Sequence, residues 1–318
     1  MEKISILIPC YNEEENVVPI SNAIVEEITK NLPQYDYELI FIDNDSQDNT
    51  RPLLRNICKQ NPKIKAIFNA KNFGQHNSPY YGMLQTTGHC TIMMCCDFQD
   101  PIEMIPILVS EWEKGAKIVS CIKTKSKENP IMRLIRTIYY KIIKKMSDVE
   151  QIEHFTGFGL YDKSFLDVMR NLKDPTPFIR GIVAELGYKR VNIEYTQAKR
   201  RAGKTHNNFF TLFDTAMLSF TSYTKIGLHL VTIVGMVISA LSFLAALFYL
   251  VYKLLFWDTF TAGLAPVMVG MFFFGGIQLL FIGLVGEYAM STNTRVMNRP
   301  LVIEEERINF EEENKENE

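Results

Sequence analysis

Carboxylate and amide side chains gather directly behind one apolar stretch of the chain, where they could bind a metal ion. The apolar stretch, 92–96, is long enough for one buried strand, and Asp97, Gln99 and Asp100 follow it. Oxygen ligands of this kind suit Mg²⁺ or Mn²⁺, which often share their coordination sphere with the phosphates of a substrate. The alternative is an ordinary strand-to-helix turn in which Asp100 caps a helix and Asp97 is solvated.

The elements that would position these side chains alternate between short apolar strands and helices, as in βαβ units with a largely parallel sheet. The expected strands are 3–9, 37–42, 64–68, 92–96 and 117–122, with helices at 14–31, 50–58, 75–86 and 101–113. Ligands of such open sheets bind outside the carboxyl ends of the strands, which is where Asp97 stands. Neither a Gly-x-Gly-x-x-Gly fingerprint nor a P-loop sequence is present.

Two basic segments follow this α/β pattern. Residues 130–146 combine apolar positions at helical spacing with basic side chains on the other side, which fits a helix on an anionic membrane or an ordinary surface helix. Residues 199–206 form a basic, glycine-containing loop, which is suited to gripping phosphate or is simply a solvated face. Residues 155–161 are expected as a loop or short strand, 178–186 as a helix and 191–195 as a strand.

The last third of the chain carries two long uncharged stretches. No charged side chain occurs between Lys225 and Lys253, or between Asp258 and Glu287. Each stretch exceeds the ~20 residues that cross a bilayer, and the basic flanks on one side predict that both termini are cytoplasmic. The expected divisions are a cytoplasmic domain (1–206), a juxtamembrane amphipathic helix (207–226), two spans (227–252 and 264–286), an external loop (253–263) and a cytoplasmic tail (287–318).

Composition narrows the functional classes. The net charge of −2 gives no general reason to expect nucleic acid as a partner. The six cysteines lack metal-type CxxC spacing and favour a reducing compartment over a disulfide framework. The first strand is too short for the apolar part of a signal peptide. The tail from Glu304 to Glu318 is acidic and poor in aromatic residues, so disorder is expected there.

Five segments in order resemble one family. They are Pro9-Cys10-Tyr11-Asn12-Glu13, Asp43-x-Asp45-Ser46-x-Asp48-x-Thr50, Asp97-x-Gln99-Asp100-Pro101, Arg200-x-x-Gly203-x-Thr205, and Gly286-Glu287-Tyr288 with Arg299-Pro300. Together they resemble the family 2 glycosyltransferases of GT-A fold, and among these the polyisoprenyl-phosphate glycosyltransferases, the group of bactoprenol glucosyltransferases and dolichol-phosphate mannose synthases. The resemblance covers nearly the whole chain except the acidic tail.

The resemblance implies roles for particular residues. The nucleotide would be held by Pro9, Tyr11, Glu13, Asp43, Asn44 and Asp45. Asp97 and Gln99 would place Mg²⁺ or Mn²⁺ on the diphosphate, with Asp100 beside them in the catalytic group. The acceptor phosphate would be held by Arg200, Arg201 and Lys204, and more weakly by Arg133 and Arg136.

The resemblance also implies the reaction. A single sugar would pass, with inversion, from a nucleotide sugar (a UDP-sugar is favoured) to undecaprenyl phosphate at the cytoplasmic face of a bacterial inner membrane. The lipid-linked product would serve the modification of cell-surface glycans. The protein would be a multi-pass membrane protein and a homo-oligomer such as a tetramer, with no nucleic acid as partner.

Three departures from the family pattern leave alternatives open. Cys95 stands where an aspartate is common, Asn44 replaces the second aspartate of an Asp-Asp-Gly-Ser segment, and 157–160 lacks an acid and an arginine. These changes indicate a different sugar or an impaired enzyme. The alternatives are a processive polysaccharide synthase, disfavoured by two spans and by the lack of a Gln-x-x-Arg-Trp segment, and a scaffold or flippase partner that keeps an inactive transferase fold.

Overall fold

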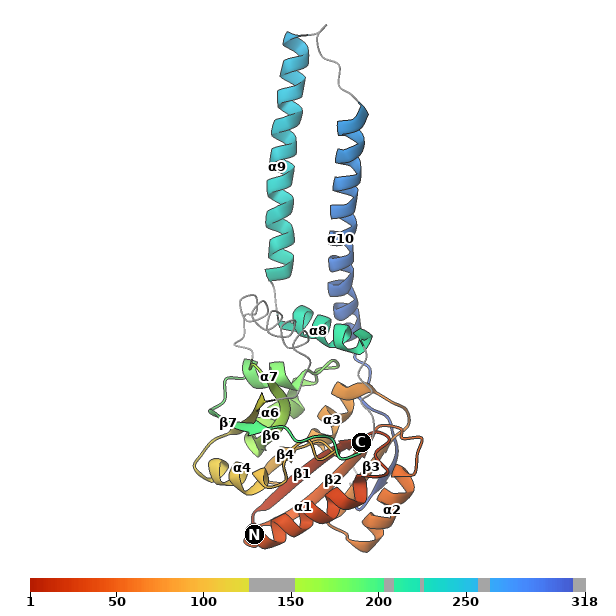
Figure 1. Cartoon of the computed structure of the whole chain (residues 1–318), viewed down its shortest axis with the longest axis vertical. Helices are drawn as coiled ribbons and strands as arrows, with labels where there is room; N and C mark the ends of the chain where they lie inside the picture. Colours follow the sequence, from red (N-terminus) through yellow and green to blue (C-terminus); the bar gives the residue numbers. More distant parts are fainter. Residues whose placement is uncertain (126–151, 203–208, 224–225, 257–263, 311–318) are drawn as a thin grey trace, which may run out of the picture.

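The chain folds into an α/β domain followed by three helices and a final strand (Figure 1). The structure is a computed structural model that describes residues 1–125, 152–202, 209–223, 226–256 and 264–310. The elements in chain order are β1 (Lys3–Cys10), α1 (Val17–Asn31), β2 (Asp36–Asp43), α2 (Thr50–Gln60), β3 (Ile64–Asn69), α3 (Gly74–Leu84), β4 (Cys90–Met93), α4 (Met104–Glu113), β5 (Ile118–Lys125), β6 (Phe155–Asp162), α6 (Lys163–Leu172), α7 (Ile179–Glu185), β7 (Arg190–Thr196), α8 (Phe209–Tyr223), α9 (Ile226–Leu255), α10 (Leu264–Met297) and β8 (Glu304–Ile308).

One mixed sheet of eight strands forms the centre of the domain, in the order β7-β5-β6-β4-β1-β2-β3-β8. Strand β1 pairs in parallel with β4 and with β2, and β2 pairs in parallel with β3. Strand β5 pairs in parallel with β7. Strand β6 runs antiparallel to β4 and β5, and β8 runs antiparallel to β3. The predicted α/β class with a mostly parallel sheet and flanking helices is confirmed.

The central strands are apolar because both faces of the sheet are covered. Ile4, Ile6 and Ile8 of β1 point to one core cluster, together with α1, α2 and α4, while Leu7 points to a second cluster with α3, α6 and α7. This separation follows from the two-residue period of a strand. Strands buried on both faces read as continuous apolar runs rather than as an alternating pattern.

Three helices follow the domain, the short α8 and the two long helices α9 and α10. Figure 1 shows α9 and α10 extending away from the sheet in the same direction, with α8 lying across near their base. The ring of Tyr223 at the end of α8 sits where a Cβ on Gly181 would come within 2.2 Å of it, so a glycine in α7 permits this docking. Arg295 of α10 also donates to Asp174 of the domain at 2.9 Å.

Among the described residues, one segment is long and apolar enough to cross a membrane, Gly270–Met297 of α10, and a shorter apolar stretch, Val231–Ala245, lies in α9. Large apolar side chains on both helices are exposed, including Phe243, Phe272 and Leu279. The expectation of two membrane spans is therefore not confirmed by helix length and composition, although both helices exist. Residues 253 and 257–263 of the expected external loop lie outside the residues whose side chains the structure describes.

Several boundaries differ from the sequence-based expectation. Strand β4 ends at Met93, so residues 94–96 belong to the turn that follows the strand. Helix α4 begins at Met104 rather than at Pro101. Helix α6 was not expected. The expected disorder from Glu304 is wrong for 304–308, which forms β8 because it pairs with the free edge of β3. The expected amphipathic helix 130–146 lies outside the described residues.

Candidate active site

The polar turns that follow β1, β2 and β4 meet at one edge of the sheet. Strands β1 and β2 run in parallel and end together at the pair Cys10↔Asp43. Strand β4 pairs with the other side of β1 and reaches the pair Leu7↔Met93. Because the strands are parallel, the segments beyond their carboxyl ends gather in one place.

Side chains of the second turn hold the backbone of the first. Asn12 has a left-handed backbone (φ 56°), a conformation that asparagine tolerates better than most residues. Its N–H donates to Ser46 Oγ at 2.8 Å, and its Oδ1 accepts from the Gln47 N–H at 2.8 Å. The N–H of Glu13 donates to Thr50 Oγ1, also at 2.8 Å. The hydroxyls of Ser46 and Thr50 thereby fix the direction in which the Glu13 side chain leaves the turn.

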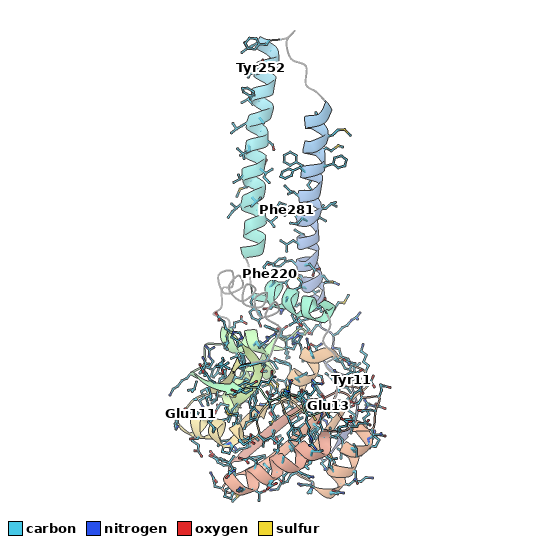
Figure 2. All side chains as sticks on the ribbon, viewed as in Figure 1. Tyr11, Glu13, Glu111, Phe220, Tyr252 and Phe281 are labelled. Atoms are coloured by element: carbon cyan, nitrogen blue, oxygen red, sulfur yellow. The ribbon has the colours of Figure 1, made fainter. Side chains whose placement is uncertain are left out.

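The expected nucleotide-binding residues all stand at this edge. They are Pro9 near the end of β1, Tyr11 and Glu13 in the turn after it, Asp43 at the end of β2, and Asn44 and Asp45 just beyond. Figure 2 labels Tyr11 and Glu13 in the half of the domain that faces α8. The sequence-based grouping of these six residues is reproduced in space, whereas their contact with a nucleotide stays a prediction.

Asp43 is fully buried at the end of β2. Its Oδ2 accepts from Arg51 Nε at 2.6 Å and from the Ser46 N–H at 3.2 Å. Its Oδ1 is buried, and no hydrogen-bond partner for it occurs in the described parts of the chain. An unsatisfied buried acceptor is costly, and in a candidate binding site it indicates a donor supplied by a ligand.

Asn44 is the centre of an amide network next to Asp43. Its Oδ1 accepts from Asn69 Nδ2 at 3.0 Å and from the Phe73 N–H at 2.9 Å, while its Nδ2 donates to Asn72 Oδ1 at 2.9 Å. An aspartate at this position could accept the two bonds but could not donate the third. The departure from the Asp-Asp pattern therefore fits the local structure, because Asn44 ties β2 to the loop after β3.

Asp97 lies in a tight turn beyond β4. Its Oδ1 accepts from the Gln99 N–H at 3.1 Å, and Phe98 between them adopts a left-handed backbone (φ 60°). Although charged, the Asp97 residue is only 3% exposed. A buried carboxylate needs a compensating positive partner or a metal ion.

Asp100 has a different surrounding from Asp97. Its Oδ2 accepts from the Cys95 N–H at 2.8 Å and its Oδ1 accepts from the Tyr195 hydroxyl at 3.2 Å. Burial raises the pKa of Asp100 to about 6, and the nearby charge of Asp97 acts in the same direction. Both oxygens are used within the protein, so Asp100 ties β7 to the turn after β4. The expected catalytic role for Asp100 stays a prediction, whereas the anchoring contacts are observed.

Cys95 occupies the place where the family resemblance leads us to expect an aspartate. The charges of Asp100 and Asp97 raise the pKa of the Cys95 thiol well above its ordinary value, although the residue itself is exposed. A neutral thiol is a poor ligand for a hard cation, since the thiolate is the metal-binding form. The structure thus supplies one charged carboxylate fewer at this turn than the Asp-x-Asp pattern would.

The basic loop that follows β7 docks directly on the Asp97 turn. Backbone bonds join the Ala198 N–H to the Gln99 carbonyl and the Arg201 N–H to the Asp97 carbonyl, both at 3.2 Å. The guanidinium of Arg200 then reaches Asp97 Oδ2 with its Nη2 at 2.9 Å. Its Nη1 lies 3.9 Å from Glu13 Oε1. Arg200 therefore stands between carboxylates from the first and third motifs.

The carboxylates of this cluster have a positive partner in Arg200. Burial raises the pKa of Glu13, while the Asn16 amide, which donates to Glu13 Oε2 at 2.6 Å, and the charge of Arg200 act against the rise. The expected ligands Asp97 and Gln99 form a donor set of the hard oxygen type that divalent ions prefer. This donor set is of the right chemical type for such an ion. Arg200 places positive charge beside the carboxylates of Asp97 and Glu13. Among the described residues, no group of three histidine, cysteine, aspartate or glutamate side chains has metal-binding geometry.

The other candidates for the acceptor phosphate are only partly placed. The guanidinium of Arg201 lies 5.2 Å from the ring centroid of Phe98, so it too packs on the Asp97 turn. Lys204, Arg133 and Arg136 lie outside the described residues. The structure brings Arg200 and Arg201 to the expected metal turn, and no described contact tests the phosphate role.

Segment 157–160 is sterically constrained at one position. Gly159 in β6 lies between two strands, and a Cβ there would come within 2.3 Å of the Val119 carbonyl oxygen. Phe158 packs edge-on against Tyr195, with ring centroids 5.4 Å apart, and Tyr195 is the residue that donates to Asp100. Phe158 therefore stabilises the turn that carries Asp97 and Asp100 through its contact with Tyr195.

Sequence reasoning missed the residues that hold the site together. Ser46, Asp48 and Thr50 belong to the second of the five segments, yet their contacts with the first turn were not predicted. Such contacts could have been expected, because carboxylate and hydroxyl side chains readily accept hydrogen bonds from backbone N–H groups of turns. Arg51 and Tyr195 carry no motif of their own. Their roles depend on contacts made by the fold, from Arg51 to Asp43, Asn69 and Glu305 and from Tyr195 to Asp100.

Comparison with known proteins identifies the family. The glycosyl transferase family 2 model matches residues 5–169. A prophage bactoprenol glucosyl transferase homolog of Escherichia coli (strain K12) is 30% identical over 302 residues, covering 95% of this chain and 98% of the relative. The SfII prophage-derived bactoprenol glucosyl transferase of Shigella flexneri is also 30% identical, covering 95% and 97%.

Among solved structures, a glucosyl-3-phosphoglycerate synthase from Mycobacterium tuberculosis in complex with Mn²⁺, UDP and phosphoglyceric acid gives a TM-score of 0.46 at 14% identity, covering 69% of this chain and 76% of that one. The family model spans the strands and turns that carry Glu13, Asp43 and Asp97 but ends before β7 and the basic loop, and the relatives are matched over nearly their whole length. The protein is a glycosyltransferase with a GT-A-like α/β fold, and the chain belongs to glycosyl transferase family 2.

Proposed function

We propose that this glycosyltransferase moves a single sugar from a nucleotide sugar, preferably a UDP-sugar, to a polyprenyl phosphate such as undecaprenyl phosphate. The observation that carries the proposal is the bond from Arg200 to Asp97, with Glu13 beside it, because it joins the basic loop to the acidic motifs in one site. The names of the relatives, which include bactoprenol glucosyl transferase, support a lipid-linked product. Such a product would serve the modification of cell-surface glycans.

The chemistry needs little proton transfer. A phosphate monoester has its second ionisation near pH ~6, so the acceptor already carries a nucleophilic oxygen at neutral pH. That oxygen would attack the anomeric carbon while the bond to the nucleoside diphosphate breaks, which inverts the configuration. Arg200 would bind the acceptor phosphate, with Arg201, Lys204, Arg133 and Arg136 as further candidates. Asp97 and Gln99 would hold Mg²⁺ or Mn²⁺, which would stabilise the departing diphosphate as a Lewis acid.

We further propose that residues 227–252 and 264–286 cross the inner membrane of a bacterium, with the catalytic domain (1–206), the juxtamembrane helix (207–226) and the tail (287–318) in the cytoplasm. The exposed apolar side chains of α9 and α10 support this. A cysteine placed at Trp257 in a cysteine-free background should react with an impermeant reagent on intact cells. Reaction at position 310 instead would reverse the topology.

The partners of the proposed reaction are the nucleotide sugar, the polyprenyl phosphate and the membrane. We also propose a homo-oligomer, for instance a tetramer, since the family resemblance implies one, and a flippase that receives the lipid product. Light scattering of the purified protein–detergent complex would give the oligomeric state. A monomer at working concentration would contradict that part of the proposal.

The decisive experiment combines purified protein with undecaprenyl phosphate and a panel of radiolabelled UDP- and GDP-sugars, followed by lipid extraction. We expect one sugar to appear in the organic phase as a lipid-linked monosaccharide, and none with Asp97→Asn. A labelled polymer would indicate a processive synthase. No transfer and no hydrolysis of any donor would indicate a scaffold, as the neutral thiol of Cys95 would allow.

A further inference from the structure

The C-terminal strand reaches back to the nucleotide side of the domain. Strand β8 pairs antiparallel with β3 at the pairs Ala66↔Ile308 and Phe68↔Glu306, although the elements from α3 to α10 separate the two strands in the chain. Figure 1 shows the described end of the chain beside β3, far from the tips of α9 and α10. An acidic strand thus covers a sheet edge that would otherwise offer unpaired backbone groups.

Two glutamates of β8 pair with two arginines of α2. Glu306 Oε2 accepts from Arg55 Nη2 at 2.6 Å, and Glu305 Oε2 accepts from Arg51 Nη1 at 2.8 Å. The two arginines are one helical turn apart, and both guanidinium groups lie over the ring of Phe68, at 4.8 Å for Arg55 and 5.7 Å for Arg51. The two ion pairs join the same two elements, but among the described contacts only Arg51 also bonds to Asp43.

Arg51 joins the C-terminal strand to Asp43. Besides Glu305, its guanidinium donates through Nε to Asp43 Oδ2 at 2.6 Å and through Nη2 to the Asn69 carbonyl at 2.5 Å. Its Nη2 also lies 3.6 Å from Asp45 Oδ1. The Arg51 side chain is only 15% exposed, and its guanidinium is fixed by acceptors on Asp43, Asn69 and Glu305. A guanidinium can bridge acceptors in this way because its donors are fixed in one plane.

Two buried acceptors beside this bridge have no partner among the described residues. They are Asp43 Oδ1 at the end of β2 and Asn69 Oδ1 at the end of the neighbouring β3. Buried acceptors are normally satisfied, so this pair of oxygens fits a ligand that brings N–H groups. The imide or amide edge of a nucleobase is such a group. The orientation of Asp43 then depends on Arg51, which fixes its other oxygen.

We propose that Arg51 is a positioning residue for the nucleobase of the donor, and that Glu305 of β8 holds Arg51 in place. The C-terminal strand would thereby complete the donor pocket from the far end of the chain. This inference rests on the proposed function, in which the donor is a nucleotide sugar.

The test compares two matched glutamate variants in the full-length protein. Glu305→Gln removes the partner of Arg51, and Glu306→Gln removes the equivalent partner of Arg55, which is not bonded to Asp43. Binding of UDP, with GDP in parallel, is measured by calorimetry, and the KM for undecaprenyl phosphate is measured alongside. We expect Glu305→Gln to weaken nucleotide binding about two- to fivefold, the range of an exposed ion pair, and Glu306→Gln to leave it unchanged.

A third variant, Arg51→Lys, should weaken nucleotide binding about tenfold or more, because a single ammonium cannot bridge Asp43, Asn69 and Glu305 together. The KM for the lipid acceptor should stay the same in all three variants. Equal effects of Glu305→Gln and Glu306→Gln on nucleotide binding, or no effect of either, would overturn the inference even if Arg51→Lys fails to fold. A wild-type protein that binds neither UDP nor GDP would instead overturn the proposed function, and the inference with it.

Discussion

The arginine at the centre of the site neutralises carboxylates that come from distant parts of the chain. Asp97 is nearly buried, and Arg200 Nη2 lies 2.9 Å from its Oδ2. In such surroundings a charge-assisted hydrogen bond contributes about 1.5–3 kcal/mol, more than a neutral one. The same carboxylate is the strongest candidate for holding the donor diphosphate through a metal ion, so its charge matters to binding and to chemistry.

Asp97→Asn is expected to abolish transfer while the protein stays folded. Asparagine keeps the shape and can still accept from the Gln99 N–H, but it loses the charge that a metal ion and Arg200 require. Losing one electrostatic stabiliser of a transition state costs about 100- to 1,000-fold in rate. Transfer is measured by lipid extraction and folding by thermal denaturation. Wild-type turnover of the variant at saturating Mn²⁺ and Mg²⁺ would show that the metal assignment is wrong.

Arg200→Ala is expected to lower lipid-linked product about ten- to a hundredfold, since each 1.4 kcal/mol corresponds to about a factor of ten. Arg200→Lys should restore only part of it, because an ammonium cannot grip two phosphate oxygens at once. Donor affinity, measured by calorimetry, should stay within about threefold of wild type if Arg200 serves the acceptor. Loss of donor affinity with an unchanged dependence on the acceptor would assign Arg200 to the diphosphate.

The sequence predicts which residues stand near each other at the site, but not how they are connected. Asp43 and Asp97 follow parallel strands, and the carboxyl ends of such strands meet, so their grouping was predictable. The bond between Arg200 and Asp97 was not, because it depends on backbone contacts of a loop from another part of the chain. Asp100 resembles Asp97 in sequence, yet its oxygens are used by Cys95 and Tyr195.

Helix α3 connects the α/β domain to α8. Near its start, Gln75 Nε2 donates to Thr215 Oγ1 of α8 at 3.0 Å, and a ring nitrogen of His76 lies 3.3 Å from the same oxygen. The His76 ring also packs edge-on against Phe178, with centroids 5.6 Å apart. Burial, together with the charge of Arg180, lowers the pKa of His76 to about 4.

Acidification should therefore weaken the docking of α8. The unfolded chain takes up a proton at His76 below about pH 6.5, whereas the folded protein does so only near pH 4, so stability falls as the pH drops through this window. At pH 5 the loss is about 1–2 kcal/mol, or a few degrees in Tm. His76→Gln should reduce the difference in Tm between pH 7.5 and pH 5. The exposed His89 provides the control, and an equal reduction in His89→Gln would contradict the assignment.

The parallel strands were predictable because strands buried on both faces are apolar throughout, and β1 and β2 lie within two residues of the expected ranges. Strand β8 was not predictable, since Glu304, Glu305 and Glu306 argue against a strand in isolation. Only the edge of β3 and the arginines of α2 make that sequence favourable as a strand. Tertiary contacts overrule local preference more readily in strands than in helices.

At the scale of the whole molecule, the domain depends on chain segments from both sides of its long helices. A protein that ends at residue 300 would lose β8, the buried side chain of Val302 and the ion pairs to α2. Its Tm should fall by at least about 5 °C, since 1 kcal/mol corresponds to about 2–4 °C in a domain of this size. The open edge of β3 should also promote aggregation, visible by size-exclusion chromatography.

The matched control for this truncation ends at residue 310 and keeps β8 entire. It should behave as the full-length protein in both measurements. A peptide of residues 301–310, added in excess to the shorter protein, should recover part of the lost Tm, because it can pair with β3 again. Equal Tm values for the proteins ending at 300 and 310 would show that β8 does not stabilise the domain.

The position of β8 also sets the order in which the molecule is made. A ribosome synthesises α9 and α10 before it reaches the strand that completes the sheet, at a rate of about 5–20 residues per second. Every newly made chain therefore passes through a stage in which both long helices exist and β3 is still unpaired on one side. Chains that stall during synthesis of the helices keep that open edge, which distinguishes them from finished molecules and exposes them to proteolysis.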